Sequence, residues 1–303
     1  MKFTMISRPW DNVIEEVAAA GHEYVDSVDD ADFIIYSGGP LPDPLPENVR
    51  FIQWVFTGVE QLVGAGVMKP GTRWANAAGV FAKPVAEHAM ALILASLHQY
   101  KYVFEKSSFS IRREMDSRQD WLFLNKRVAI FGAGGIGREL ISMLRPFGPH
   151  ITAVNRSGRP VEGADETVAM AEADHVWGEA DIVVLVTPLT FETIGMVNAE
   201  VLDRMKESAY LINVGRGGLV VTDDLVDALS NRRIRGAGLE VVDPEPLPEE
   251  HALWHLDNVV LTPHVAALGS VARAMIAPTI IANAAAVERG ERMPTEVDVE
   301  AGY

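Results

Sequence analysis

The fold of this 303-residue chain is decided by the stretch Arg127-Val128-Ala129-Ile130-Phe131-Gly132-Ala133-Gly134-Gly135-Ile136-Gly137. Its first five residues are a short β-rich run, as expected of a buried strand. Apolar residues then recur at helical spacing as far as Phe147, Gly148-Pro149 ends the helix, and Ile151–Asn155 reads as a second strand. The order strand, glycine turn, helix and strand predicts a unit that binds a nucleotide.

Three glycines of this stretch form a G-x-G-x-x-G pattern and have separate physical tasks. Gly132 permits a tight turn, Gly134 lets the backbone approach a pyrophosphate, and Gly137 lets the helix pack closely on the strand. The N-terminus of the helix adds unpaired N–H groups and a partial positive charge, which favour phosphate. The pattern with these flanks therefore favours dinucleotide binding over a plain glycine-rich turn.

The composition excludes several classes of function. The net charge is −16, so the mean field repels nucleic acids and anionic membranes. There is no cysteine, which excludes disulfides and thiol chemistry. No apolar run is long enough to span a bilayer, and Met1–Ile6 reads as a strand rather than a signal peptide, so we expect a cytoplasmic protein. The histidines show no metal-ligand spacing, and no metal site is expected.

Strand-like and helical segments alternate on both sides of the glycine motif. This alternation predicts an α/β fold with doubly wound parallel sheets, whose ligands bind at the carboxyl ends of the strands. Pro84–His98 reads as an apolar connector helix, on which His88 is expected to make structural hydrogen bonds. Tyr100–Leu124 reads as an irregular linker or oligomer arm. Single helices are predicted near Val168–Gly178 and over about Ser270–Arg289.

Three polar residues follow three late predicted strands. Arg216 follows Ala209–Val214, Glu245 follows Gly236–Val241, and His264 follows Val259–Leu261. An arginine can bind a substrate carboxylate and polarise an adjacent carbonyl, and a histidine can give the carbonyl oxygen a proton as hydride arrives. A carboxylate on the far ring nitrogen fixes the tautomer. Each residue alone could be an ordinary loop residue, but together on one rim they predict a reductase.

With these residues the chain resembles the D-isomer-specific 2-hydroxyacid dehydrogenases, the family of glyoxylate/hydroxypyruvate reductases and phosphoglycerate dehydrogenases. The resemblance runs from about Phe51 to Ala267 and rests on ordered motifs. These are Phe56–Val59, Asn76–Val80, Ala86–Met90, the glycine motif, Thr187–Thr193, Asn213–Gly217, Asp243–Pro248 and Asn258–His264.

The resemblance implies two Rossmann-like domains with a cleft between them. The substrate domain would comprise residues 1–98 plus 282–303, and the dinucleotide domain residues 99–281. It implies that Arg216, Glu245 and His264 are catalytic and that the Thr57, Gly58 and Val59 turn binds the substrate with Arg216 and His264. It also implies a homodimer, with the 84–98 and 100–124 regions in the interface. The cofactor-binding residues that we assign are Gly132, Gly134, Gly135, Ile136, Gly137, Asn155, Arg156, Ser157, Thr187, Pro188, Val214, Gly215, Glu240 and Ala266.

The chain departs from the family pattern at two cofactor positions. The residue that ends the second nucleotide strand is usually acidic in NAD users, because it binds the ribose 2′-hydroxyl, but here it is Asn155. Arg156 can pair with a 2′-phosphate and Ser157 can donate a hydrogen bond to it, so NADP(H) is favoured and NAD(H) is possible. Glu240 stands where the family normally has an aspartate that contacts the nicotinamide carboxamide.

The sequence therefore predicts an NAD(P)H-dependent reductase that converts a small 2-keto acid, of the glyoxylate or hydroxypyruvate kind, to a D-2-hydroxy acid and back. A non-catalytic, NAD(P)-binding interaction or sensor protein on the same scaffold is the alternative. A methyltransferase with a similar first turn is disfavoured, because it has no use for the arginine, glutamate and histidine. The sequence does not name the keto acid.

Overall fold

The computed structural model describes residues 1–69 and 71–299, which form two compact units. The smaller unit contains Met1–Phe81 and the chain from Ala267 onward, and the larger unit contains Ala82–Ala266. Both units are built on parallel sheets flanked by helices, which confirms the predicted α/β fold class. Within the described ranges no single helix is long and apolar enough to cross a membrane, although one bent pair passes on length and composition alone.

The smaller unit has a five-stranded parallel sheet in the order β2-β1-β3-β4-β5. Stacked rings of Phe3, Phe33 and Phe51 run across three of its strands, with centroids 5.4 and 4.8 Å apart. Its strands and helices are β1 Lys2–Ile6, α1 Asp11–Ala19, β2 Glu23–Tyr24, η1 Val28–Asp30, β3 Phe33–Tyr36, β4 Phe51–Trp54, α2 Glu60–Gly64, β5 Trp74–Ala75, α11 Gly269–Met275 and α12 Ala277–Glu288.

The C-terminal part of the chain is built into the core of this smaller unit. Asn283 of α12 is fully buried and donates to Gln53 Oε1 on β4 at 2.7 Å. Arg73 forms a two-pronged pair with Glu296, at 3.0 and 2.8 Å. Both contacts join segments more than 200 residues apart, since the sequence separations are 230 and 223.

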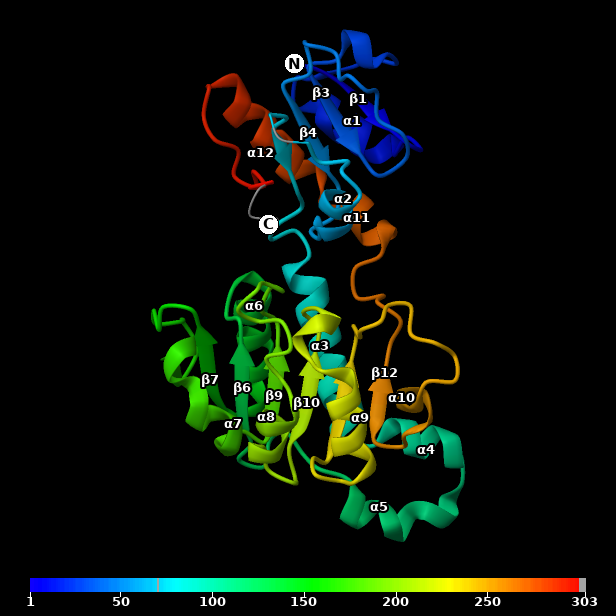
Figure 1. Ribbon diagram of the computed structural model, residues 1–303, viewed down its shortest axis with the longest axis vertical. Coiled ribbons are helices and arrows are strands. Elements are labelled where there is room, and N and C mark those ends of the chain that lie inside the picture. Colours follow the sequence, from blue (N-terminus) through cyan, green and yellow to red (C-terminus); the bar gives the residue numbers. More distant parts are fainter. Residues whose placement is uncertain (70, 300–303) are drawn as a thin grey trace. The chain divides into compact units, whose positions relative to one another are not determined.

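The larger unit has a seven-stranded parallel sheet in the order β12-β11-β10-β9-β6-β7-β8, and most of its strands are labelled in Figure 1. The order turns between β6 and β9, so the glycine turn after β6 lies at the switch point of the sheet. The strands are β6 Arg127–Phe131, β7 His150–Asn155, β8 Glu166–Ala169, β9 Ile182–Leu185, β10 Tyr210–Asn213, β11 Gly236–Leu239 and β12 Val259–Leu261.

Helices cover both faces of this sheet. Two of them, α3 (Ala82–Leu97) and α6 (Gly135–Leu144), pack together in one apolar cluster with the sheet. A second cluster on the sheet contains α7 (Val176–Glu179), α8 (Ala199–Arg204) and α9 (Thr222–Ser230). The remaining elements are α4 Tyr100–Lys106, η2 Phe109–Ile111, α5 Arg112–Arg118, η3 Arg145–Phe147, η4 Met170–His175, η5 Gly217–Leu219 and α10 Ala252–His255.

The divisions between the units differ from those expected, because two helices belong to other units. Helix α3 packs its buried residues on α6 and the seven-stranded sheet, so the division falls at 81/82 rather than 98/99. The chain returns to the smaller unit at Ala267 rather than at residue 282, because α11 already contacts α1.

Three local predictions are corrected by the structure. The single final helix is two helices, α11 and α12, which are bent by 53° relative to each other, and Pro278 lies in the first turn of the second. The segment near Val168–Gly178, predicted as one helix, begins with the last residues of a strand, because β8 pairs with β7 at the sheet edge. The segment Tyr100–Leu124 is mostly helical rather than irregular, since α4, η2 and α5 occupy much of it.

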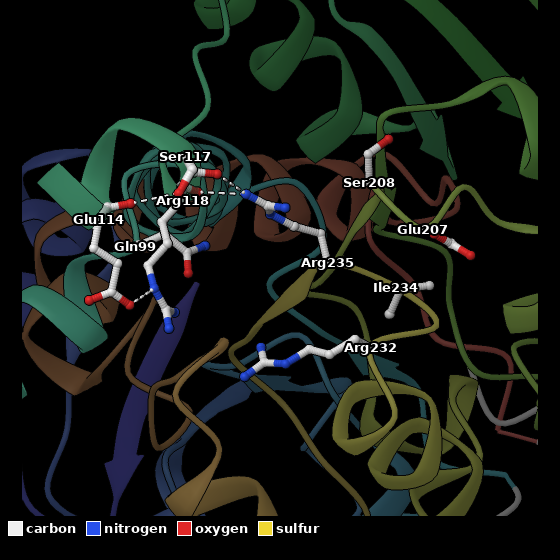
Figure 2. A pocket seen from close by; sticks show the side chains of 9 residues that line it. All are labelled: Gln99, Glu114, Ser117, Arg118, Glu207, Ser208, Arg232, Ile234 and Arg235. Carbon is white, nitrogen blue, oxygen red and sulfur yellow. Dashed lines mark hydrogen bonds and ion pairs between the residues drawn. The ribbon is translucent and has the colours of Figure 1, made fainter.

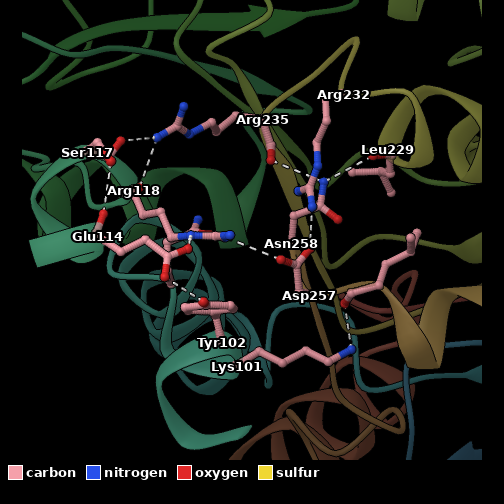
Figure 3. A network of polar contacts seen from close by, with 12 residues as sticks. Lys101, Tyr102, Glu114, Ser117, Arg118, Leu229, Arg232, Arg235, Asp257 and Asn258 are labelled. Carbon is pink, nitrogen blue, oxygen red and sulfur yellow. Dashed lines mark hydrogen bonds and ion pairs between the residues drawn. The ribbon is translucent and has the colours of Figure 1, made fainter. Parts of the chain in front are cut away.

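Polar contacts hold this helical segment, which we call the arm (Tyr100–Leu124), on the larger unit (Figure 3). Lys101 donates to the carbonyls of Trp254 and Leu256 at 2.6 and 2.7 Å. Arg118 pairs with Glu114 at 2.6 Å and with Asp257 at 3.2 Å, and its guanidinium lies 3.9 Å from the centre of the Tyr102 ring. The arm is therefore anchored on its own unit.

Candidate functional site

The glycine turn after β6 has the geometry that a phosphate-binding turn requires. Gly132 has φ +100°, and a Cβ there would lie 2.5 Å from the Thr187 nitrogen, so no other residue fits. A Cβ on Gly137 would lie 3.0 Å from the Gly132 oxygen, because the helix runs close to the turn. At Gly134 the nearest such atom is 4.0 Å away. The exposed backbone of Gly134 and Gly135 thus leaves room at the N-terminus of α6 for the pyrophosphate of a dinucleotide.

The end of β7 carries the residues expected to meet the ribose. Asn155 shapes the loop, because its amide donates to the Arg159 carbonyl at 2.8 Å and accepts from the Ser157 N–H at 3.1 Å. Arg156, Ser157 and Arg159 are exposed around this bend. The loop therefore offers two guanidinium groups and a hydroxyl, with no carboxylate among residues 155–159, which fits a phosphorylated ribose.

The loop after β10 presents Arg216 from a closely packed backbone turn. The side chain of Asn213, which is 1% exposed, accepts from Gly215 N–H at 3.1 Å and donates to the Arg216 carbonyl at 2.9 Å. The Arg216 guanidinium donates to the Gly215 carbonyl at 2.9 Å. A Cβ on Gly215 would lie 3.0 Å from the Thr187 oxygen, so this turn touches the loop after β9 that contains Thr187 and Pro188.

The loops after β10 and β11 are also in direct backbone contact. A Cβ on Gly217 would lie 1.9 Å from the Val242 carbonyl oxygen and 2.7 Å from the Asp243 nitrogen. Glu245 follows two residues later, so the glycine sets the Arg216 loop against the loop that carries Glu245.

The structure brings His264 and Glu245 together at the carboxyl ends of β11 and β12. His264 Nδ1 lies 2.5 Å from Glu245 Oε1, and both side chains are about half exposed, at 51% and 42%. Because an ionised carboxylate only accepts, this contact puts a proton on Nδ1 and leaves Nε2 as the nitrogen that can exchange a proton with a substrate. His264 has φ +54°, a left-handed conformation that is uncommon for histidine.

Glu240 is a carboxylate residue that is almost fully buried, at 3% exposure. Its Oε2 lies 2.9 Å from His88 Nε2 and accepts from the Thr262 hydroxyl, and its Oε1 accepts from the Ala266 N–H at 2.5 Å. Burial on its own would raise the pKa of this carboxyl. The hydrogen bonds from His88, Thr262 and Ala266 outweigh that effect and hold the pKa below its usual value.

Sequence reasoning assigned neither Asn213 nor Thr262 to the site and did not foresee the pairing of His88 with Glu240. His88 lies more than 150 residues before Glu240, so no spacing rule could join them. Asn213 was visible inside its motif, but its role depends on backbone groups that only the folded turn brings together.

The substrate turn assigned in the smaller unit follows β4. The carbonyls of Thr57 and Gly58 accept from Asn76 Nδ2 and Trp54 Nε1, both at 2.9 Å. These two bonds fix the turn through its carbonyls.

A cavity of about 600 Å³ lies at the amino ends of strands β10 and β11, opposite to the strand ends that carry Arg216, Glu245 and His264 (Figure 2). Its walls include Arg118, Arg232 and Arg235. Arg118 and Arg232 are paired with Asp257, and Arg235 donates to the carbonyls of Ser117 and Arg118. This cavity is therefore part of the anchoring of the arm and is remote from the glycine turn. In residues 1–69 and 71–299 no group of His, Asp and Glu side chains is arranged to hold a metal.

Comparison with known proteins gives the same picture as the geometry. Residues 89–266 match the sequence profile described as D-isomer specific 2-hydroxyacid dehydrogenase, NAD binding domain. The chain belongs to the D-isomer-specific 2-hydroxyacid dehydrogenase family. The predicted family is thereby confirmed, and with it an NAD(P)-dependent enzyme that acts on 2-hydroxy acids.

Relatives of this dehydrogenase extend over most of its length. A Corynebacterium melassecola protein, named only as an uncharacterized protein in the proB 3′ region, is 52% identical over 100% of both chains. The mouse glyoxylate reductase/hydroxypyruvate reductase is 31% identical over 85% of this chain and 79% of its own. A D-isomer specific 2-hydroxyacid dehydrogenase from Xanthobacter autotrophicus Py2, solved with NADPH and MES, has a TM-score of 0.83 and 25% identity, covering 100% and 99% of the two chains.

Proposed function

We propose that this dehydrogenase uses NADPH to reduce glyoxylate, hydroxypyruvate or a similarly small 2-keto acid to the D-2-hydroxy acid, and that it catalyses the reverse oxidation. The observation that carries the proposal is the 2.5 Å contact between His264 Nδ1 and Glu245 Oε1, because the loop that leads to Glu245 also packs against the Arg216 turn. The substrate class is supported by the name of the mouse relative.

Each residue of the trio has a task that its geometry suits. When bound, the reduced cofactor supplies a hydride for the keto carbon. His264 gives the proton on Nε2 to the carbonyl oxygen, so that hydride and proton together convert the ketone to an alcohol, and in oxidation His264 takes this proton back. Glu245 stabilises the charged ring through Nδ1. Arg216 binds the substrate carboxylate and polarises the carbonyl.

The preference for the phosphorylated cofactor rests on the bend after β7. The uncharged side chain of Asn155 hydrogen-bonds to the loop backbone, while Arg156 and Ser157 are exposed beside it. An aspartate or glutamate in place of Asn155 would repel a 2′-phosphate. The NADPH bound to the Xanthobacter relative supports the same preference. NAD(H) remains usable, because the pyrophosphate-binding turn does not depend on the 2′ group.

The experiment is a steady-state panel of glyoxylate, hydroxypyruvate, pyruvate and bulkier keto acids with NADPH and NADH. We expect turnover of the small acids with a lower KM for NADPH. His264→Ala and Arg216→Ala should each lower kcat/KM by roughly 10²- to 10⁴-fold. His175→Ala is the control, because that ring is exposed and, within residues 1–69 and 71–299, hydrogen-bonds only to the nearby Glu172 carbonyl. A tenfold preference for NADH, or an unchanged keto-acid KM in Arg216→Ala, would contradict the proposal.

We further propose that the enzyme is a homodimer that uses the arm. Six large apolar side chains of the arm are exposed, by up to 96% at Phe109, and they are Tyr100, Phe104, Phe109, Trp121, Phe123 and Leu124. The polar contacts of Lys101 and Arg118 hold the arm on the larger unit, so this apolar surface is presented on a fixed support. Replacing Phe104 and Phe109 by serine should convert a dimer to a monomer in light scattering, with Phe191→Ser, equally exposed outside the arm, as the control.

A further inference from the structure

The contacts of Glu240 converge on the loop that carries His264. This loop, Thr262–Ala266, joins β12 to the next segment and has no regular secondary structure. Its Thr262 hydroxyl and its Ala266 N–H both donate to the Glu240 carboxylate. Two backbone bonds complete the attachment, from Thr262 N–H to the Leu239 carbonyl at 2.9 Å and from His264 N–H to the Glu240 carbonyl at 3.1 Å. The loop is therefore held at both of its ends and at His264 by one short stretch of chain.

The opposite side of the carboxylate is held by helix α3. His88 Nε2 lies 2.9 Å from Glu240 Oε2 and 3.0 Å from the Thr262 hydroxyl. Because α3 is packed into the core of the larger unit, His88 connects the loop to a helix that the core holds in place. The three groups form a closed triangle of His88, Glu240 and Thr262.

The backbone conformation of His264 explains why its loop needs these hydrogen bonds. A side chain with a Cβ adopts φ +54° only where its surroundings hold it there. The neighbouring Val265 and Pro263 are exposed, so apolar packing does not hold the loop. The hydrogen bonds to Leu239 and Glu240 are the contacts that can.

We infer that Glu240, braced by His88, is a positioning residue that holds the Thr262–Ala266 loop so that the His264 ring meets the substrate. The inference rests on the proposed role of His264 as the proton donor. It gives Glu240 a task beyond the nicotinamide contact suggested by the family aspartate, since both carboxylate oxygens already bind groups of the His264 loop or of α3. The extra methylene of glutamate provides the reach to the Ala266 N–H on one side and to His88 on the other.

The first test is Glu240→Gln, which keeps the shape but replaces one acceptor oxygen by an NH₂ group that cannot accept from Thr262. We expect kcat to fall roughly 10- to 100-fold, as for a misplaced catalytic group. The keto-acid KM and the NADPH Kd, measured by fluorescence, should stay within about threefold. Glu240→Asp should restore part of the loss because it keeps the charge. An unchanged kcat in Glu240→Gln would overturn the inference.

Thr262→Val decides the case if Glu240→Gln does not fold, because it removes a single hydroxyl near the surface. It should lower kcat in the same direction by a smaller factor. The matched control is Thr152→Val, which removes a buried threonine hydroxyl that donates to the Glu166 carboxylate at 3.4 Å on β7. A loss of kcat in the control equal to that in Thr262→Val would mean that the loss is structural, and would overturn the inference.

The decisive comparison is made in a His264→Ala background. A residue that acts through His264 has no further effect once His264 is absent, so Glu240→Gln should leave the residual rate of His264→Ala unchanged. If Glu240→Gln lowers that residual rate by the same factor as in the wild type, the positioning role is wrong while the proposed function stands. If His264→Ala itself keeps full activity, the proposed function fails.

Discussion

Gly217→Ala tests how the backbone contact between the Arg216 and Glu245 loops sets the site. The added Cβ would lie 1.9 Å from the Val242 oxygen and 2.1 Å from the Val242 carbonyl carbon. Both atoms are backbone, so no side chain can turn away to make room. Real Cβ contacts do not fall below 3.0 Å, and the two loops must therefore separate by about 1.1 Å.

The size of the effect follows from that separation. Misplacing a substrate-positioning group by 1 Å costs about 10²-fold in rate, or about 2.7 kcal/mol of transition-state stabilisation. Overpacking adds about 1–3 kcal/mol of lost stability, which corresponds to a Tm lower by roughly 2–10 °C for a protein of this size. Arg216 is next in sequence to the altered residue, so we expect both a higher KM for the keto acid and a lower kcat.

The assay compares Gly217→Ala with Gly218→Ala in keto-acid kinetics and thermal unfolding. A Cβ on Gly218 would meet only the flexible Leu189 side chain, at 3.1 Å, so this control should change kcat/KM by no more than about threefold. NADPH affinity should be retained in both variants. If Gly217→Ala matched Gly218→Ala in kcat/KM and in Tm, the contact would not determine the geometry of the site.

Three further outcomes are expected. Gly132→Ala, which combines φ +100° with a contact of 2.5 Å to the Thr187 nitrogen, should abolish saturable NADPH binding in a fluorescence titration, whereas Gly148→Ala, also at positive φ but in open space, should not. Arg156→Ala should raise the NADPH Kd by about tenfold, or about 1.4 kcal/mol, and leave the NADH Kd unchanged; an equal loss for both cofactors would contradict the 2′-phosphate role. The hydrogen bond from Arg73 lowers the pKa of the Glu296 carboxyl below its usual value of 4.5. The pair therefore contributes its full stability above pH 4.5 and loses it as the pH falls through the lowered pKa. Glu296→Gln should therefore cost about 1 kcal/mol at pH 7 and much less in strong acid, as chemical denaturation at several pH values would measure.

The parts of the fold that could be predicted are those governed by local pattern. The strand at Val128–Phe131 could be predicted because a buried strand requires a run of apolar residues. The turn at Gly132–Gly137 could be predicted because a positive φ requires glycine. The strand at Glu166–Ala169 was not predicted, because it is short, lies at the sheet edge and is followed directly by the helix-forming residues Met170-Ala171-Glu172-Ala173. The break at Pro278 was readable in principle, but apolar periodicity across it suggested a single helix.

The site divides in the same way. Arg216, Glu245 and His264 could be found because each follows a strand and parallel strands end on one edge. Glu240 was noticed only as a departure from the family pattern. Its contacts depend on His88 and on the loop after β12, which come together through packing of α3 on the sheet. Buried polar partners at long sequence separation leave no periodic trace, so the sequence could not assign Glu240 its partners.

The interleaving of the two units bears on the order in which the chain folds. Residues 82–266 are contiguous, so the larger unit has all of its strands as soon as they leave the ribosome. The smaller unit is incomplete at that stage, because the hydrogen-bond partners of Gln53 and Arg73 are Asn283 and Glu296, which are synthesised last. During synthesis the first 81 residues must therefore remain without their final helix while the larger unit forms. A released chain truncated before Ala277 should accordingly protect the larger unit from protease and leave the smaller unit sensitive.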